Sequence, residues 1–309
     1  MTGVSVACPA KVNLFLRVLA REDSGYHQIE TLFQAVGLYD RVEAYPGTGG
    51  GIGLEVRPGT EDLGLGDPAA ELGDTEDNTV VRAARAFFAA TGIAPSAKLV
   101  LTKAIPAGTG LGGASSDAAG TLAALNALHG EPLALDPLLR LGGTIGADVP
   151  FFCAGAATAL AWGRGDRLLA CPPPPAAPVV VVVPRMRTST VAAYRGLAAT
   201  LALPALPARV RGIGAGSWKA LAALQGNDFE RAAFAGAPAL AELRDALDSH
   251  GALVARMTGS GSALFGVFGD RNRADETAAE AGAMAGVAAA FVSPTLTGMP
   301  TPRRTRSEA

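Results

Sequence analysis

The segment with the clearest chemical purpose is a glycine-rich stretch over residues 105–117. Its glycines at positions 108, 110, 112 and 113 carry no side chain that would keep an anion away from the backbone N–H groups. The stretch runs directly into a predicted helix over residues 114–128, whose free N–H groups and positive dipole end favour phosphate. Ser115 and Ser116 add hydroxyls that can bind a phosphate oxygen or magnesium. The pattern therefore predicts a binding site for a nucleotide polyphosphate.

Two common glycine motifs have to be weighed against this interpretation. A Walker A loop ends in Gly-Lys-Ser or Gly-Lys-Thr, and the chain contains no such triplet. Gly108, Gly110 and Gly113 match the dinucleotide fingerprint GxGxxG, which requires a second strand after the helix. Asp136, followed by proline, predicts the N-cap of another helix there instead. A dinucleotide-dependent oxidoreductase, a non-catalytic nucleotide-binding module and a purely structural turn stay as alternatives.

The elements that position the loop follow from hydrophobic periodicity. Period-2 alternation over residues 12–18 predicts a strand just after Lys11. Further strands are predicted over residues 29–36, 42–45, 52–56 and 97–102, and the acidic stretch 57–77 is expected to be a solvated loop. Asn78 or Thr79 can cap a helix whose apolar residues between 80 and 88 share one face.

The second half of the chain begins after a proline-rich linker at residues 172–178. It contains a predicted strand over 179–183, helices from about 191 and over 238–250, strands over 252–257 and 263–268, and a helix over 274–285. We therefore predict an α+β fold with an N-terminal domain at 1–171 and a C-terminal domain at 179–293. A flexible tail is expected at 294–309, where Arg303, Arg304 and Arg306 form the only basic cluster.

Composition narrows the class of protein. The 309 residues are 49% hydrophobic and 17% charged, which is typical of a folded, core-rich chain, and the net charge of -2 argues against a nucleic-acid binder. The three cysteines, Cys8, Cys153 and Cys171, form no CxxC pair, so we expect reduced thiols. The first residues lack the pattern of a secretory signal, and the longest aliphatic run, 179–183, is too short for a bilayer. A cytoplasmic protein without membrane or nucleic-acid partners is expected.

Three separated motifs resemble those of the galactokinase, homoserine, mevalonate and phosphomevalonate (GHMP) kinase superfamily. They are the first motif, residues 9–14 (Pro-Ala-Lys-Val-Asn-Leu), the glycine-rich loop, residues 106–116, and the third motif, residues 257–263 (Met-Thr-Gly-Ser-Gly-Ser-Ala). Gly-Tyr-His at 25–27, Thr-Leu-Phe-Gln at 31–34 and Gly-Ala-Asp-Val-Pro-Phe-Phe at 146–152 resemble one branch of it. That branch phosphorylates the 2-hydroxyl of a methylerythritol carrying a cytidine diphosphate group, in non-mevalonate isoprenoid synthesis.

The resemblance implies a two-domain GHMP kinase fold, with an N-terminal domain like the second domain of ribosomal protein S5. It implies ATP and Mg²⁺ as cofactors, a small-molecule substrate with a cytidine diphosphate group, and a cleft between the domains where the two meet. We expect a monomer or weak homodimer. A GHMP kinase for another alcohol, such as homoserine or mevalonate, is the alternative with the same chemistry. Two positions of the loop depart from the family: Thr109 stands where glycine or alanine is usual, and Ala114 stands where glycine is usual.

Catalytic roles are carried over by position. Asp148 resembles the base that receives the hydroxyl proton, although a loop carboxylate or helix cap is the simpler interpretation from sequence alone. Lys11 resembles the group that stabilises the transferring phosphoryl, and a lysine on an apolar strand needs a partner such as Asp148. An edge-strand lysine in water is its alternative. Asn13 lies two residues further on the same face of the strand and can hydrogen-bond the substrate.

The remaining binding residues follow the same resemblance. Tyr26 and Tyr194 are expected to stack on the cytosine, His27 to bind its polar edge, and Thr190 to lie beside it; an aromatic such as Tyr194 can also be core. Lys103 and Asn78 are expected near the nucleotide, with a helix cap as the alternative for Asn78. Ser116 is the predicted magnesium ligand. The phosphates are expected along the whole loop, which consists of Pro106, Ala107, Gly108, Thr109, Gly110, Leu111, Gly112, Gly113, Ala114, Ser115 and Ser116.

Overall fold

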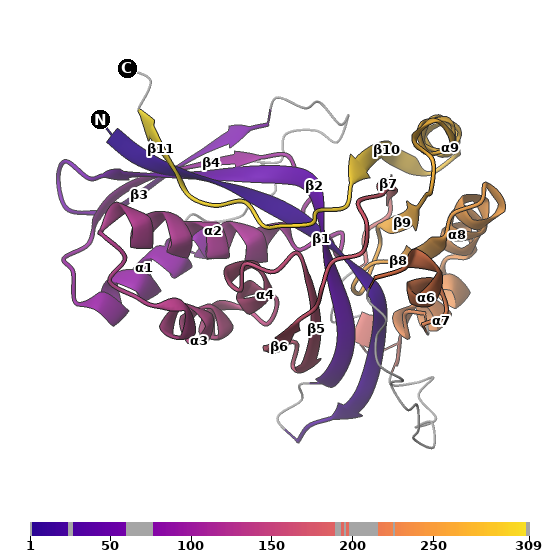
Figure 1. Ribbon diagram of the computed structural model, residues 1–309, viewed down its shortest axis with the longest axis horizontal. Helices are drawn as coiled ribbons and strands as arrows, with labels where there is room; N and C mark the ends of the chain where they lie inside the picture. Colours follow the sequence, from indigo (N-terminus) through magenta and orange to yellow (C-terminus); the bar gives the residue numbers. More distant parts are fainter. Residues whose placement is uncertain are drawn as a thin grey trace.

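The computed structural model describes residues 2–23, 27–59, 77–188, 193–194, 196–197, 216–224 and 226–306, and these form two halves, each a sheet with helices (Figure 1). The first half contains the N-terminal strands and the helices within residues 79–153, and the second contains the strands and helices within residues 178–294. No helix in the described part of the chain is both long and apolar enough to cross a membrane.

Two long strands form the centre of the first half. β1 (Thr2–Arg21) and β2 (His27–Pro46) pair antiparallel along nearly their whole length and curve from the upper sheet into a hairpin beside the second half (Figure 1). The sequence predicts shorter strands because bulges in this pairing, between Pro9 and Ala10, between Asn13 and Phe15 and between Val18 and Ala20, interrupt the alternation. The sheet has the order β11-β1-β2-β4-β3, and β5 pairs with β2 and β6. The other strands are β3 (Gly51–Pro58), β4 (Ser96–Lys103), β5 (Thr158–Gly163), β6 (Arg167–Ala170) and β11 (Arg303–Arg306).

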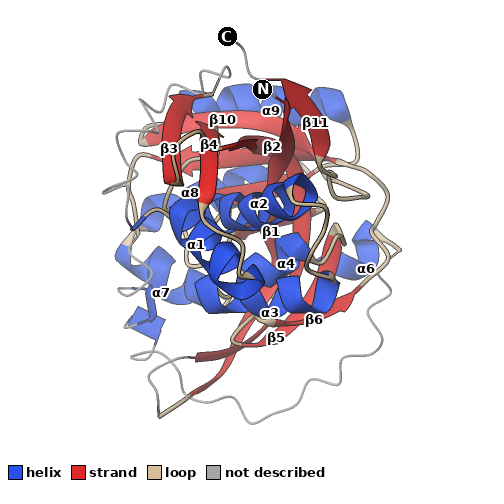
Figure 2. Ribbon diagram, turned by 90° about the vertical axis from the view of Figure 1, so that its left-hand side faces the viewer, coloured by secondary structure: helices blue, strands red, loops and turns tan. Residues whose placement is uncertain are grey.

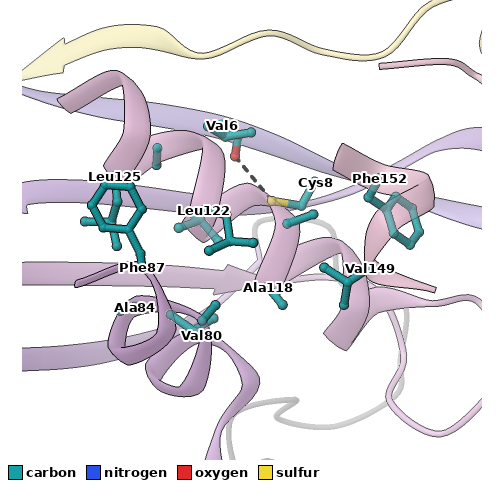
Figure 3. Packing of buried hydrophobic residues seen from close by; sticks show 14 of the residues in the cluster. Val6, Cys8, Val80, Ala84, Phe87, Ala118, Leu122, Leu125, Val149 and Phe152 are labelled. Atoms are coloured by element: carbon teal, nitrogen blue, oxygen red, sulfur yellow. Dashed lines mark hydrogen bonds between the residues drawn. The ribbon is translucent and has the colours of Figure 1, made fainter. Parts of the chain in front are cut away.

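Four helices cover one face of this sheet (Figure 2): α1 (Thr79–Thr91), α2 (Gly113–Leu128), α3 (Leu135–Ile145) and α4 (Val149–Cys153). Apolar side chains of α1, α2 and α4 meet those of β1 in the buried core of Figure 3. A Cβ at Gly120 would lie 2.2 Å from Cys8 Sγ, so glycine there lets α2 approach β1. The prediction of Asp136 as the N-cap of α3 is wrong, because the helix begins at Leu135 and Asp136 lies in its first turn.

The second half is a four-stranded sheet in the order β10-β7-β9-β8. The aliphatic residues of β7 (Pro178–Pro184) are buried on both faces, as the unbroken run of valines predicts. Leu243 on α8 and Ala274 on α9 pack against Val180 and Phe268 on one side of this sheet. Its elements are β8 (Val254–Met257), β9 (Leu264–Val267), β10 (Val287–Pro294), α6 (Trp218–Ala222), α7 (Phe229–Gly236), α8 (Pro238–Ser249) and α9 (Arg271–Ala283).

The expectation of a flexible tail after residue 293 is corrected by the structure. Residues 294–306 run back across the first half, where β11 pairs with β1 from Thr2↔Arg306 to Ser5↔Arg303 (Figure 1). On the way, the carbonyl of Leu296 accepts a hydrogen bond from Gln34 Nε2 at 2.8 Å. The edge of β1 supplies unpaired backbone groups, and charged side chains are well suited to such an edge strand. Residues 307–309 lie outside the described part.

Candidate active site

The glycine-rich loop is shaped by close approaches from both halves. Gly108, Gly110 and Gly112 have positive φ angles of 67°, 86° and 78°. A Cβ on Gly110 would lie 2.2 Å from the carbonyl oxygen of Thr258, and one on Gly112 would lie 3.0 Å from Lys11 Cγ. Side chains at these positions would therefore collide with the third and first motifs as well as strain the backbone.

Hydrogen bonds fix the loop between the other two motifs. The backbone N–H of Lys11 donates to the carbonyl of Leu111 at 2.8 Å, and the N–H of Ala263 donates to the carbonyl of Thr109 at 3.1 Å. The Thr109 hydroxyl closes the loop internally by donating to the carbonyl of Pro106 at 2.9 Å. Leu111 is buried in the core, so it anchors the loop rather than facing a ligand.

The three motifs surround one cavity of about 330 Å³ between the halves. A larger hollow of about 630 Å³ lies away from them, among side chains of β2, β4 and β11. We assign the chemistry to the smaller one because it joins the glycine-rich loop to charged groups. The predicted site residues that line it are Lys11, Asn13, Lys103, Pro106, Ala107, Gly108, Thr109, Gly110, Gly112, Gly113, Ala114, Ser115, Asp148 and Tyr194.

Lys11 and Asp148 form the charged pair that the sequence predicts. Lys11 Nζ lies 3.5 Å from Asp148 Oδ2, and the two side chains are 3% and 29% exposed. Burial lowers the pKa of Lys11, and the negative charge of Asp148 only partly opposes this. Asp148 is the N-cap of α4, but its side chain makes no capping hydrogen bond. The carboxylate thus faces both the ammonium and the cavity.

Asn13 is buried and connects the halves. Its Oδ1 accepts hydrogen bonds from Lys11 Nζ at 2.7 Å and from the backbone N–H of Gly259 at 2.9 Å. Its Nδ2 donates to Thr31 Oγ1 at 2.8 Å. Much of the amide is therefore used within the protein, so the hydrogen bond to substrate stays a prediction.

Lys103 sits beneath the start of α2. Its ammonium contacts Asp40 and donates to Asp117 Oδ2 at 2.8 Å, and a Cβ on Gly113 would lie 3.2 Å from it. Asp40 also accepts the backbone N–H groups of Ala104 and Ile105, at 2.6 and 2.8 Å. Burial pulls the pKa of Lys103 down, but the two carboxylates outweigh it and raise that pKa. The lysine that was predicted to lie near the nucleotide therefore has an ammonium that is already paired with two carboxylates.

The two serines at the start of α2 face different ways. Ser115 lines the cavity, whereas Ser116, the predicted magnesium ligand, is 1% exposed, does not line the cavity, and has a buried hydroxyl without a hydrogen-bond partner among the described residues. Asn78 is the N-cap of α1, with Oδ1 accepting the backbone N–H of Val80 at 2.9 Å. The alternative of a helix cap therefore describes its side chain.

Aromatic groups from both halves meet beside the cavity, where Tyr194 lines the wall and His27 does not. His27, at the start of β2, stacks on Tyr194 with ring centroids 4.3 Å apart and an interplanar angle of 23°. Tyr194 also contacts Phe229 edge-on at 4.8 Å. Burial and then the charge of Asp148 raise the pKa of Tyr194. Tyr26 and Thr190 lie outside the described residues.

Sequence reasoning missed two arginines, one that lines the cavity and one that contacts the loop. Arg164, in the turn between β5 and β6, lines the cavity and forms an ion pair with Glu22. Arg187 Nη1 donates to the carbonyl of Ala107 in the loop at 2.7 Å. The glycines on either side of Arg164 were the only local signal, since neither arginine lies in a motif.

A metal ion has few side chains to bind here. Within the described ranges there is no group of three or more His, Cys, Asp or Glu residues that could hold one. Magnesium usually keeps several waters and binds substrate phosphates with one or two protein ligands. The donor set therefore fits a magnesium ion that arrives on a nucleotide, with the Ser115 hydroxyl available at the cavity wall.

The arrangement has the parts needed for phosphoryl transfer. Backbone N–H groups and the N-terminus of α2 can hold a polyphosphate, and an ammonium and a carboxylate lie at its end. The stacked rings of His27 and Tyr194, of which Tyr194 lines the cavity, can bind a planar base.

Comparisons with known proteins agree with this chemistry. Residues 78–156 match the family described as GHMP kinases N terminal domain, and residues 202–285 match GHMP kinases C terminal. A 4-diphosphocytidyl-2-C-methyl-D-erythritol kinase from Pelotomaculum thermopropionicum is 38% identical over 281 residues, covering 89% of this chain and 93% of the relative. One of the same name from Syntrophus aciditrophicus is 36% identical over 277 residues, covering 88% and 92%.

Solved structures give the same picture. A crystal structure of 4-(cytidine 5'-diphospho)-2C-methyl-D-erythritol kinase superposes with a TM-score of 0.75 at 34% identity, over 94% of this chain and 98% of the other. Homoserine kinase from Cytophaga hutchinsonii superposes with a TM-score of 0.72 at 19% identity, over 98% and 97%, which indicates the fold alone.

Proposed function

This chain belongs to the 4-diphosphocytidyl-2-C-methyl-D-erythritol kinases of the GHMP kinase family, and from that membership we propose its reaction. The protein transfers the γ-phosphoryl group of ATP to the 2-hydroxyl of 4-diphosphocytidyl-2-C-methyl-D-erythritol, giving the 2-phosphate and ADP. The observation that carries the proposal is the Lys11–Asp148 pair, 3.5 Å apart, opening on the cavity of the glycine-rich loop.

The loop binds the nucleotide. A Cβ on Gly108 would meet no atom of the described residues nearer than Arg187 Nη1 at 4.0 Å, so phosphate oxygens can approach the backbone there. The N-terminus of α2 adds the positive end of a 16-residue helix. When bound, ATP supplies the phosphoryl group and Mg²⁺ neutralises its charge, with Ser115 in place to contact either.

Lys11 and Asp148 act on the acceptor alcohol. The Asp148 carboxylate accepts the proton of the 2-hydroxyl as its oxygen attacks the phosphorus. The Lys11 ammonium, turned toward the same point, stabilises the negative charge that spreads over the transferring group. Because Lys11 is buried, its charge acts through little screening water.

His27 and Tyr194 select the substrate. Their stacked rings come from opposite halves, and Tyr194 lines the cavity. Cytosine takes a place against these rings, with Tyr26 and Thr190 as further contacts from the same two segments. Neither homoserine nor mevalonate has a planar base for such a site, so the aromatic pair favours the cytidine-bearing alcohol.

The proposal extends to the localisation, the oligomeric state and the domain boundaries. We propose that the enzyme is cytoplasmic and monomeric or weakly dimeric. The domain boundary lies in the linker 172–178, and residues 294–306 belong to the first domain. Sedimentation of the purified protein measures its oligomeric state.

The test is to offer the purified protein ATP and Mg²⁺ with each of three alcohols: the diphosphocytidyl alcohol, homoserine and mevalonate. ADP release and phosphorus NMR of the product are measured in parallel. We expect rapid turnover of the diphosphocytidyl alcohol alone, with the new phosphate on its 2-oxygen. Equal or better turnover of homoserine or mevalonate would overturn the assignment.

A further inference from the structure

The Lys11 ammonium is oriented by an amide oxygen as well as by a carboxylate. Asn13 Oδ1 lies 2.7 Å from Lys11 Nζ, closer than the 3.5 Å to Asp148. A neutral amide can present either its oxygen or its nitrogen, and only the oxygen accepts a hydrogen bond from an ammonium. Whatever holds the Asn13 amide in this orientation therefore also orients Lys11.

Thr258, in the third motif, is placed to do this. Its hydroxyl accepts the backbone N–H of Asn13 at 3.2 Å and lies 3.1 Å from Asn13 Oδ1, to which it can donate. The next residue, Gly259, donates its N–H to the same oxygen at 2.9 Å. Donors from the third motif thus converge on the amide oxygen, while Thr31 Oγ1 accepts a hydrogen bond from the amide nitrogen at 2.8 Å.

The third motif is itself held firmly. Asn227 Nδ2 donates to the carbonyls of Met257 and Gly259 at 2.9 and 2.7 Å, and the N–H of Thr258 donates to the carbonyl of Ala263 at 3.0 Å. Thr258 is fully buried, and its hydroxyl also lies 3.3 Å from the carbonyl of Gly110 in the loop. One hydroxyl of the second half therefore touches both the first motif and the loop.

We propose that Thr258 is a positioning residue for phosphoryl transfer, whose hydroxyl holds the Asn13 amide with its oxygen toward Lys11. The inference rests on the proposed function, because it assigns to Lys11 the stabilisation of the transferring group. It gives the third motif a role in orienting a catalytic group. The third motif can hold the amide oxygen toward Lys11 only when this motif, in the second half, lies against β1.

The matched variants are Thr258→Val, which removes the hydroxyl at nearly the same volume, and Thr258→Ser, which keeps it. We expect Thr258→Val to lower kcat roughly 10- to 100-fold, the size of effect that a misplaced catalytic group produces, with little change in KM for ATP. Thr258→Ser should stay within about threefold of the wild type, because the lost methyl group makes none of these hydrogen bonds.

A shift in the pH profile separates positioning from a loosened fold. The charged groups lining the cavity around Lys11, within the described residues, are Asp148, Lys103 and Arg164, and Tyr194 also titrates there. None of these changes in Thr258→Val, so an Asn13 amide whose oxygen turns away from Lys11 lowers the pKa of Lys11 further. The alkaline limb of kcat should move to lower pH, because the ammonium form is lost earlier. General loosening would lower the rate equally at every pH.

The inference is overturned if Thr258→Val keeps the kcat of Thr258→Ser, or if its rate falls while the alkaline limb stays in place. Should Thr258→Val melt below the assay temperature, Thr258→Ala carries the same test, because it also removes the hydroxyl that contacts Asn13. Its alkaline limb should move to lower pH as well, and an unmoved limb overturns the inference.

Failure of the proposed function is distinguishable from failure of this inference. The wild type is assayed first on each alcohol, and absence of transfer to the diphosphocytidyl alcohol overturns the substrate assignment alone. The Thr258 series is then run on whichever alcohol the wild type phosphorylates, and the same shift of the alkaline limb is expected there.

Discussion

Two buried lysines lie at the glycine-rich loop, and they differ in the number and the exposure of the carboxylates that they contact. Lys11 is 3% exposed and Lys103 is 2% exposed. Lys11 faces one carboxylate, Asp148, which is 29% exposed and opens on the cavity. Lys103 contacts two, Asp40 and Asp117, both almost completely buried. Burial lowers the pKa of Lys11, whereas two carboxylates raise the pKa of Lys103 in spite of burial.

The difference separates a reactive charge from a structural one. A carboxylate shared between an ammonium and a cavity can accept a proton from a ligand, as Asp148 can. A carboxylate such as Asp40, which accepts two backbone N–H groups as well as the ammonium, has its oxygens committed to the fold. We therefore expect changes at the first cluster to affect turnover and changes at the second to affect stability.

The largest effect should come from Asp148→Asn. The amide keeps the shape of the side chain but cannot accept the hydroxyl proton, so kcat should fall by about 10²–10⁴-fold. The dissociation constant for ATP should change little, because the loop binds the phosphates. Asp275→Asn on the exposed side of α9 is the matched control and should keep full activity. Turnover of Asp148→Asn near the wild-type rate would remove Asp148 from the base role.

Lys103→Met should have the next largest effect, on stability. It leaves the Asp40 carboxylate buried without a counter-charge and Asp117 without the ammonium that it contacts, which costs about 3–5 kcal/mol of unfolding free energy. Lys11→Met is the comparison variant: its charged partner, Asp148, is partly hydrated and the Asn13 oxygen keeps the N–H of Gly259, so the free energy of unfolding should change by about 1 kcal/mol or less. Urea unfolding measures both. Equal losses in the two variants would erase the distinction between the two clusters.

Asp117→Asn sharpens the same comparison through pH. Burial, with a further contribution from Asp40, raises the pKa of Asp117 well above its ordinary value of 3.8, although Lys103 opposes this. The unfolded chain therefore releases this proton first, and wild-type stability falls as pH rises above about 4. The asparagine does not titrate, so its stability relative to the wild type should rise over that range, by at most about 1.4 kcal/mol for each pH unit. A relative stability that falls instead would mean that Lys103 keeps Asp117 ionised.

Local sequence patterns predicted the helices and strands whose own residues show a clear hydrophobic pattern. The apolar face of α1 and the valine run of β7 identify those elements by themselves. β11 could not be found in this way, because Arg303–Arg306 has the composition of a solvated tail and becomes a strand only through pairing with β1. Similarly, the full lengths of β1 and β2 depend on their mutual register across three bulges.

The site divides along the same line. The glycine-rich loop can be recognised in the sequence because its glycines lie close together along the chain. Lys11 and Asp148 could be paired through the family resemblance. Asp40 had no local signal, since it meets Lys103 only after β2 and β4 pair. Thr258 had no local signal either, because its partner Asn13 lies 245 residues away in the sequence.

The smallest effect is expected for Tyr194→Ala, which tests whether the second half contributes to base recognition as well as to the position of Lys11. Stacking on a base is worth about 1–3 kcal/mol, but the free protein must first give up the His27–Tyr194 stack, worth about 0.5–1.5 kcal/mol. The net loss should raise KM for the cytidine substrate only about 2- to 12-fold, with KM for ATP unchanged. Tyr194→Phe keeps the ring and should behave as the wild type, and Tyr39→Ala, outside the cavity, controls for loss of an aromatic. If Tyr194→Ala leaves KM for the cytidine substrate unchanged, the rings are a contact between the halves, and the specificity has to come from the first half alone.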